Sequence, residues 1–305
     1  MTLATDGVRR MHADELEIDA TLVRKLLTGQ FPHWAGLPID RVDSPGTDNA
    51  IFRLGPDLAV RLPRIHWAAG DVEKEGAWLP RIAPHLPVAV PVPVGIGAPA
   101  HGYPWHWSVA PWLPGDNAFD SPPADLIVLA KDLARFVIAL HAVDAEDGPP
   151  EDAPRAGRGV PLSTRHEAVL TAVAKLEGVI DTAAALAAWN EALDAPNWDG
   201  PPVWIHGDLQ QTNLLMEDGR LTGVIDFGAL GVGDPAADLI PAWSFFEGES
   251  RAVYRDVLGV DEATWARGRG WALSVGLIAL PYYIDTNPVI VEWSRRSVDA
   301  VSGTR

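Results

Sequence analysis

The sequence predicts an α+β fold with a β-rich N-terminal lobe, residues 1–110, and a mostly helical C-terminal lobe, residues 111–305. Strand-like apolar runs separated by turn residues occupy the first third of the chain. Beyond Pro114 and Gly115, apolar residues instead recur with the spacing of helices. The composition shifts at 111–115, and we therefore expect the lobe boundary there.

The elements of the N-terminal lobe follow from local pattern. The turn residues Gly55, Pro56 and Asp57 separate two apolar runs, which is typical of a β-hairpin. The expected elements are a leading amphipathic helix at 14–27, hairpin strands at 50–54 and 58–62, a helix at 72–82 and a strand at 105–110.

The C-terminal lobe reads as helical with one interruption. Apolar residues at 124–143 lie on one face of a predicted helix, and further helices are expected at 163–194 and beyond Pro235. The longest apolar stretch, Trp271 to Ile284, is shorter than the roughly 20 residues that span a bilayer, so it predicts a buried helix. Two short strand-like runs, 203–205 and 221–225, flank a polar loop.

Composition narrows the class of protein. The 305 residues are 47% hydrophobic and carry a formal net charge of −17, which disfavours nucleic acid as a partner. The acidity suits cationic small molecules, or it simply keeps the chain soluble. The chain has no cysteine, and its N-terminus lacks the apolar core of a signal peptide, so we expect a cytoplasmic protein without a membrane segment.

The polar loop and the second strand-like run place three oxygen-bearing side chains near one another: Asp208, Asn213 and Asp226. Magnesium prefers such oxygen ligands and usually takes one or two from the protein when phosphates supply others. Asn213 and Asp226 would suffice as metal ligands. Asp208 would then be free to accept the proton of a substrate hydroxyl during phosphoryl transfer.

The motifs that carry these residues are HGDLQQTN at 206–213 and VIDFG at 224–228. In order and spacing they resemble the catalytic and metal-binding loops of the aminoglycoside-phosphotransferase and macrolide-kinase families, relatives of protein kinases. The resemblance implies a bilobal protein-kinase-like fold, Asp208 as catalytic base, and Asn213 and Asp226 as metal ligands. It also implies that Asp238 braces the catalytic loop and that His206 packs rather than acts as a base.

By the same resemblance the N-terminal lobe would bind ATP or GTP with Mg²⁺. Gly46 and Thr47 would lie in the loop over the phosphates, although one glycine is fewer than the kinase pattern has. The chain's four lysines, at positions 25, 74, 131 and 175, all fall outside the strand where the kinase lysine belongs, and Arg61 occupies that place.

Two further positions complete the expected nucleotide site. Glu75 would orient Arg61, with Glu73 as the competing choice. Backbone groups near Ser108 and Ala110 would meet the purine in the hinge between the lobes.

The acceptor would be a small hydroxylated molecule, an aminoglycoside or a macrolide. Aromatic and acidic residues of the C-terminal region would bind it, and Glu247, Tyr282 and Asp285 are the candidates. A metabolic kinase of sugars or alcohols, and a non-catalytic nucleotide-binding regulatory module, are the alternatives.

Overall fold

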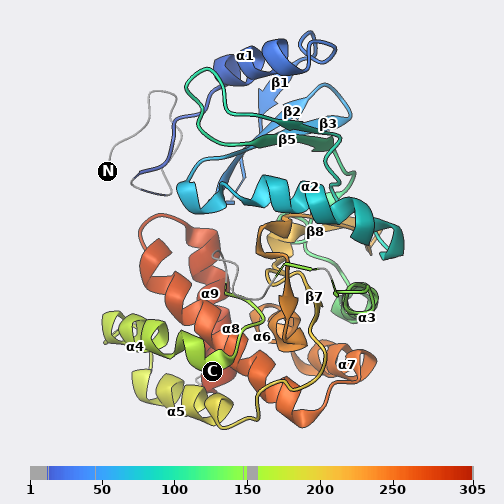
Figure 1. Cartoon of the computed structure of the whole chain (residues 1–305). Coiled ribbons are helices and arrows are strands. Elements are labelled where there is room, and N and C mark those ends of the chain that lie inside the picture. Colours follow the sequence, from blue (N-terminus) through green and yellow to red (C-terminus); the bar gives the residue numbers. More distant parts are fainter. Residues whose placement is uncertain (1–11, 13, 45, 147, 150–156, 304–305) are drawn as a thin grey trace.

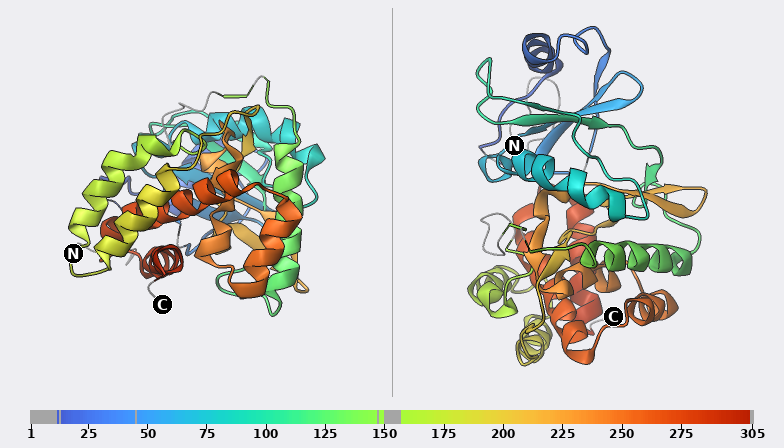
Figure 2. Two further views of the ribbon diagram at one scale, coloured as in Figure 1. Left: turned by 90° about the horizontal axis from the view of Figure 1, so that it is seen from below. Right: turned by 45° about the vertical axis from the view of Figure 1, so that its right-hand side comes forward.

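The computed structural model describes residues 12, 14–44, 46–146, 148–149 and 157–303. An upper lobe built on a β-sheet lies on a larger lower lobe of helices, and α2 (Asp71–Ile82) runs across the junction between them (Figures 1 and 2). The N-terminal segment, on which the expectation of no signal peptide rests, lies outside the described residues.

The sheet lobe contains an antiparallel sheet in the order β1-β2-β3-β5-β4. Its strands are β1 (Ile39–Arg41), β2 (Asn49–Leu54), β3 (Leu58–Pro63), β4 (Gly95–Gly97) and β5 (Trp107–Pro111). The predicted hairpin is β2 and β3, in which Ala50 is opposite Leu62. At Gly97 the Trp107 indole packs so close that a Cβ would lie 2.0 Å from it, so only glycine fits there.

Helix α1 (Ala20–Gln30) covers the upper face of this sheet (Figure 1). It begins later than predicted because the Asp19 carboxylate accepts a hydrogen bond from the Leu22 amide at 2.7 Å and caps the helix. Leu26 and Leu27 of α1 belong to one buried cluster with Phe52 of β2 and other apolar residues of the sheet. This core fixes the sheet that carries Arg61.

Helix α2 belongs to both lobes. Its Leu79 and Ile82 are buried in the main core, together with residues of α3 (Leu126–His141) and β8 (Leu214–Glu217) of the lower lobe. Glu75 lies one turn before Leu79 in the same helix, and its side chain pairs with Arg61 of β3. A helix anchored in this way can hold a charged side chain at the junction of the lobes.

The lower lobe contains short strands between its helices. Its strands are β6 (Asp116–Asn117), β7 (Val203–Ile205), β8 (Leu214–Glu217), β9 (Arg220–Val224) and β10 (Gly231–Gly233). Its helices are α3 (Leu126–His141), α4 (His166–Lys175), α5 (Thr182–Leu193), α6 (Pro241–Ser244), α7 (Gly248–Leu258), α8 (Glu262–Tyr283) and α9 (Pro288–Ser302). Strands β6, β8 and β9 form one small sheet, and β7 pairs with β10.

Helix α8 is the centre of this lobe and contains the apolar stretch that the sequence predicts to be a buried helix. Trp271, Leu273 and Leu277 are fully buried. Arg267 of the same helix donates to Asp234 at 2.6 Å, and both side chains are buried. The pair ties α8 to the turn that follows β10. Among the described helices, including this long one, none has the length and apolarity to cross a membrane.

Candidate active site

The loop between β7 and β8 is held from below by one buried carboxylate. Asp238 is fully buried and accepts hydrogen bonds from the backbone amides of His206, at 3.1 Å, and Gly207, at 2.7 Å. His141 of α3 contacts the same carboxylate at 3.1 Å. Gly207 has a φ of 76°, a left-handed conformation that favours glycine. The carboxylate therefore fixes the start of the loop in a shape that other residues would strain.

His206 is a buried link between two loops. Its Nδ1 accepts a hydrogen bond from the Asp208 amide at 3.2 Å, so its Nε2 donates to the Ile225 carbonyl at 3.1 Å. The ring also packs on Phe227, with 4.6 Å between ring centroids. Both ring nitrogens are engaged in positioning, which leaves none to take a substrate proton.

Asp208 lies at the exposed end of this loop, with 35% of its side chain accessible. Burial of the carboxyl group raises the pKa of Asp208, and Arg158, whose Nη2 lies 4.0 Å from Oδ1, opposes that rise. Asn213 donates from Nδ2 to the Asp208 backbone carbonyl at 2.9 Å. This bond fixes the spacing of the two side chains and turns the Asn213 oxygen outward as an acceptor.

Asp226 adopts a left-handed backbone conformation, with φ 61° and ψ 72°. Such a conformation is uncommon for a residue other than glycine and is found most often at functional sites. The turn directs the carboxylate at the sheet lobe, where Arg61 Nη2 donates to Oδ1 at 2.7 Å.

Arg61 lies between two carboxylates of different elements. It donates to Glu75 of α2 and to Asp226, and only 13% of its side chain is exposed. Burial lowers the pKa of Arg61, but Glu75 and Asp226 together raise it above its ordinary value, so the guanidinium stays charged. Glu73 instead contacts His106 at the surface, so of the two glutamates it is Glu75 that meets Arg61.

These residues line a cavity of about 400 Å³ at the junction of the lobes. It contains every residue that the sequence predicts for the nucleotide and the metal: Gly46, Thr47, Arg61, Glu75, Ser108, Ala110, Asn213 and Asp226. The sequence did not predict its apolar lining, which comes from Ile51, Ala59, Pro91, Trp112, Leu215 and Ile225. A cavity lined by both apolar and charged side chains suits a purine nucleotide.

The donor set fits a hard cation. Asn213 and Asp226 offer oxygen ligands at the same cavity. Across the described part of the chain, no cluster of three or more histidine, aspartate or glutamate side chains could bind a metal alone. A divalent ion at this place would complete its coordination with oxygens of water or phosphate.

One charged residue of this region was not predicted to belong to the site. Lys74 donates from Nζ to the Gly228 carbonyl at 2.6 Å and lies 3.5 Å from the Asp71 carboxylate. Burial, with a smaller contribution from the charge of Arg61, lowers the pKa of Lys74 to about 8. Lys74 connects α2 to the turn after Asp226, and only its place beside Glu75 in the sequence could have indicated this.

The three predicted acceptor residues lie elsewhere. None of them lines the cavity. Glu247 caps the start of α7 and pairs with Arg296 at 3.4 Å. Tyr282 is 53% exposed, and its hydroxyl contacts His12 at 2.9 Å. Asp285 follows the end of α8.

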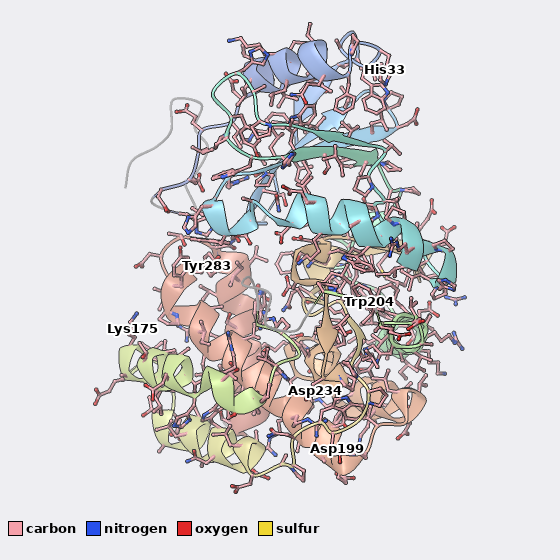
Figure 3. All side chains as sticks on the ribbon, viewed as in Figure 1. His33, Lys175, Asp199, Trp204, Asp234 and Tyr283 are labelled. Atoms are coloured by element: carbon pink, nitrogen blue, oxygen red, sulfur yellow. The ribbon has the colours of Figure 1, made fainter. Side chains whose placement is uncertain are left out.

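Tyr283, the residue after Tyr282, contacts the loop before β2 that lines the cavity. The Tyr283 hydroxyl contacts Thr47 Oγ1 at 3.2 Å. Tyr283 stands at the upper end of α8, where the helical lobe faces the sheet lobe (Figure 3). The contact joins the predicted phosphate loop to the lower lobe.

This chain is similar in sequence to known phosphotransferases. Residues 41–271 match the family model described as "Phosphotransferase enzyme family". The chain is 26% identical over 216 residues to an aminoglycoside 3'-phosphotransferase of Escherichia coli, covering 68% of this chain and 76% of that protein.

Solved structures share the whole architecture. The GDP complex of aminoglycoside 2'-phosphotransferase-IIIa superposes with a TM-score of 0.71 at 18% identity, covering 94% of this chain and 99% of that one. Macrolide 2'-phosphotransferase of Brachybacterium faecium gives a TM-score of 0.58 at 24% identity, covering 93% and 97%. The predicted bilobal kinase-like fold is thereby confirmed.

Proposed function

Because this chain belongs to the phosphotransferase enzyme family, whose reaction has an alcohol group as the acceptor, we propose that it transfers the γ-phosphoryl group of ATP or GTP to a small molecule. The residues that would do so are Asp208 as base and Asn213 and Asp226 as ligands of Mg²⁺. The observation that carries the proposal is the meeting of Asn213 and Asp226 with the Arg61–Glu75 pair at one cavity, with Asp208 hydrogen-bonded to Asn213 just outside the cavity lining.

Each residue has a definite task in this reaction. The acceptor oxygen attacks the γ-phosphorus, the bond from that phosphorus to the β,γ-bridging oxygen breaks, and Asp208 takes the hydroxyl proton. Burial favours the neutral form of Asp208, which makes it a better proton acceptor than a solvated carboxylate. The loop held by Asp238 keeps the carboxylate in place before the substrate arrives.

Arg61 and a bound metal ion would neutralise the negative charge of the phosphates. Arg61 can turn its guanidinium from Asp226 to a phosphate while Glu75 keeps it oriented. A bound Mg²⁺ would neutralise phosphate charge, held by Asn213 and Asp226. Gly46 and Thr47 would cover the phosphates from the loop before β2, where both line the cavity.

The purine would occupy the apolar part of the cavity beside β5. Ser108 and Ala110 of that strand line the cavity, opposite Leu215 and Ile225 of the lower lobe. We infer a division of labour in which residues 1–110 bind the nucleotide and residues 111–305 carry the base and the acceptor site. ATP and GTP are both candidate donors, and a structural relative holds GDP.

The relatives' names make aminoglycosides and macrolides the first acceptors to test. The full chain would be incubated with γ-labelled ATP and GTP separately, with Mg²⁺, and with a panel of aminoglycosides, macrolides, simple alcohols, and hydroxylated carboxylates and phosphates. We expect labelled product with at least one acceptor and none with Asp208→Asn. Tight nucleotide binding without transfer to any acceptor would support a regulatory module instead.

A further inference from the structure

A second group of basic side chains lies beside Asp208 and does not line the nucleotide cavity. Arg158 and Arg165 both contact the Trp271 ring of α8, each with its Cζ 5.8 Å from the ring centroid. Arg158 Nη2 is 4.0 Å from Asp208 Oδ1. Both arginines come from the segment that enters α4, and neither has a part in the reaction as described so far.

The hydrogen-bond donors of this group lack acceptors. Arg158 Nε and Nη1 and Trp271 Nε1 are buried, and no described residue accepts from them. Arg165 Nε donates only to the Ser274 hydroxyl, at a long 3.3 Å. Buried donors in folded proteins nearly always have partners, so a cluster of unmatched donors indicates that an acceptor-rich group is missing.

Electrostatics points the same way. Burial lowers the pKa of Arg165 to about 10, and the nearby charge of Arg158 adds to that effect. Within the described ranges, the contact of Arg158 with Asp208 is the one ion pair that either guanidinium makes. Two buried cations side by side repel each other unless an anion lies between them. The chain is acidic overall, so this basic site is a local arrangement and not a general property of the surface.

We propose that Arg158 and Arg165, together with Trp271, form an oxyanion subsite for the acceptor. The acceptor is then a small hydroxylated molecule that carries a carboxylate or a phosphate a few bonds from the hydroxyl that Asp208 deprotonates. Paired guanidinium groups suit the planar carboxylate and the phosphate alike. The proposal rests on the proposed phosphoryl transfer and narrows its acceptor, because a polycationic aminoglycoside would be repelled by the same two charges.

The test uses four probes on one carbon skeleton: glycerate, glycerol 3-phosphate, glycerol and 3-aminopropane-1,2-diol. Binding to the full chain is measured by titration calorimetry at constant ionic strength, with nucleotide present. We expect glycerate or glycerol 3-phosphate to bind about ten-fold or more tightly than glycerol and the amine, the size of one charge-assisted contact. The preferred member of the anionic pair identifies the carboxylate or the phosphate as the group recognised.

Variants assign the effect to the subsite. Arg158→Gln should abolish the preference for the anion, and Arg158→Lys should keep part of it. The matched control is Arg295→Gln, which removes the same charge from an exposed position on α9 and should change nothing. In Arg158→Gln the nucleotide Kd should stay within about two-fold of wild type, because Arg158 does not line the nucleotide cavity.

Several results would overturn the subsite. The first is tighter binding of glycerol or the amine than of the anions, and the second is an anion preference that survives in Arg158→Gln. The third is a raised nucleotide Kd in that variant, which would place Arg158 on the γ-phosphate. Transfer to a cationic aminoglycoside that Arg158→Gln leaves intact would uphold the reaction and refute the subsite. Anion binding lost in Arg158→Gln, without transfer to any hydroxyl, would uphold the subsite and refute the reaction.

Discussion

Arg61 of β3 donates a hydrogen bond to Asp226 across the junction of the lobes, at 2.7 Å. Glu75 holds the other side of the same guanidinium. An arginine therefore stands where kinase-like enzymes are expected to have a lysine, and it is already ordered between two carboxylates. The ion pair would compete with ligand binding, because Arg61 and Asp226 must separate before Arg61 can bind a phosphate or Asp226 a metal ion.

The first prediction concerns Arg61 itself. Arg61→Met should raise the nucleotide Kd about ten- to a hundred-fold, since a charge-assisted hydrogen bond contributes about 1.5–3 kcal/mol. Arg61→Lys keeps the charge but loses the two-sided contact, so its nucleotide Kd should lie between those of wild type and Arg61→Met. Fluorescence titration of nucleotide measures both, with Arg295→Met as control. Unchanged affinity and turnover in Arg61→Met would mean that another cation binds the phosphates.

The second prediction concerns the metal. Asp226→Asn removes the charged oxygen ligand and should weaken nucleotide binding with Mg²⁺ present while changing it little when the metal is chelated. The exposed Asp256 of α7 offers a control, Asp256→Asn, of the same chemistry. A magnesium titration that is identical in Asp226→Asn and wild type would remove Asp226 from the metal site.

Local motifs explain how much of this site was predictable. Asp208, Asn213 and Asp226 lie within nineteen residues of one another, so their spacing in the chain already limits their spacing in space. The pair of Arg61 and Glu75 followed from the order of the strand and the helix. The three-residue strands β1, β4, β7 and β10 are too short for periodicity to reveal, and β7 was found only because it adjoins the catalytic motif.

The acceptor side was not predictable in the same way. Glu247, Tyr282 and Asp285 stay predictions that rest on the aromatic and acidic composition of the C-terminal region, and composition does not show which face of a helix meets the catalytic loop. Arg158 lies fifty residues before Asp208 in the chain, and Trp271 lies far beyond both. Their meeting depends on the packing of α8 against the segment before α4, which no local pattern encodes.

The third prediction concerns the brace of the catalytic loop. Asp238→Asn places an amide where two backbone N–H groups and His141 need acceptors. The free energy of unfolding should fall by about 2–3 kcal/mol, the cost of unmatched buried hydrogen bonds to a charged group. Urea denaturation measures it, and Asp256→Asn should stay within about 0.5 kcal/mol of wild type. Equal midpoints for the two variants would refute the brace.

The fourth prediction concerns pH. Burial lowers the pKa of Lys74 to about 8 in the folded chain, against 10.5 for a free lysine. Between these values the unfolded chain binds more protons, so stability should rise with pH, by up to about 2 kcal/mol from pH 8 to 10 relative to Lys74→Met. Urea unfolding at the two pH values measures this difference. Parallel changes in wild type and variant would show that Lys74 is not desolvated.

The most direct test of the account is single-turnover phosphoryl transfer by Asp208→Asn, measured beside its nucleotide affinity. If Asp208 is the base, the transfer rate should fall about 10²- to 10⁴-fold, while the nucleotide Kd stays within about two-fold of wild type because Asp208 does not line the nucleotide cavity. A transfer rate close to that of the wild-type chain would contradict the assignment of Asp208 and with it the proposed mechanism.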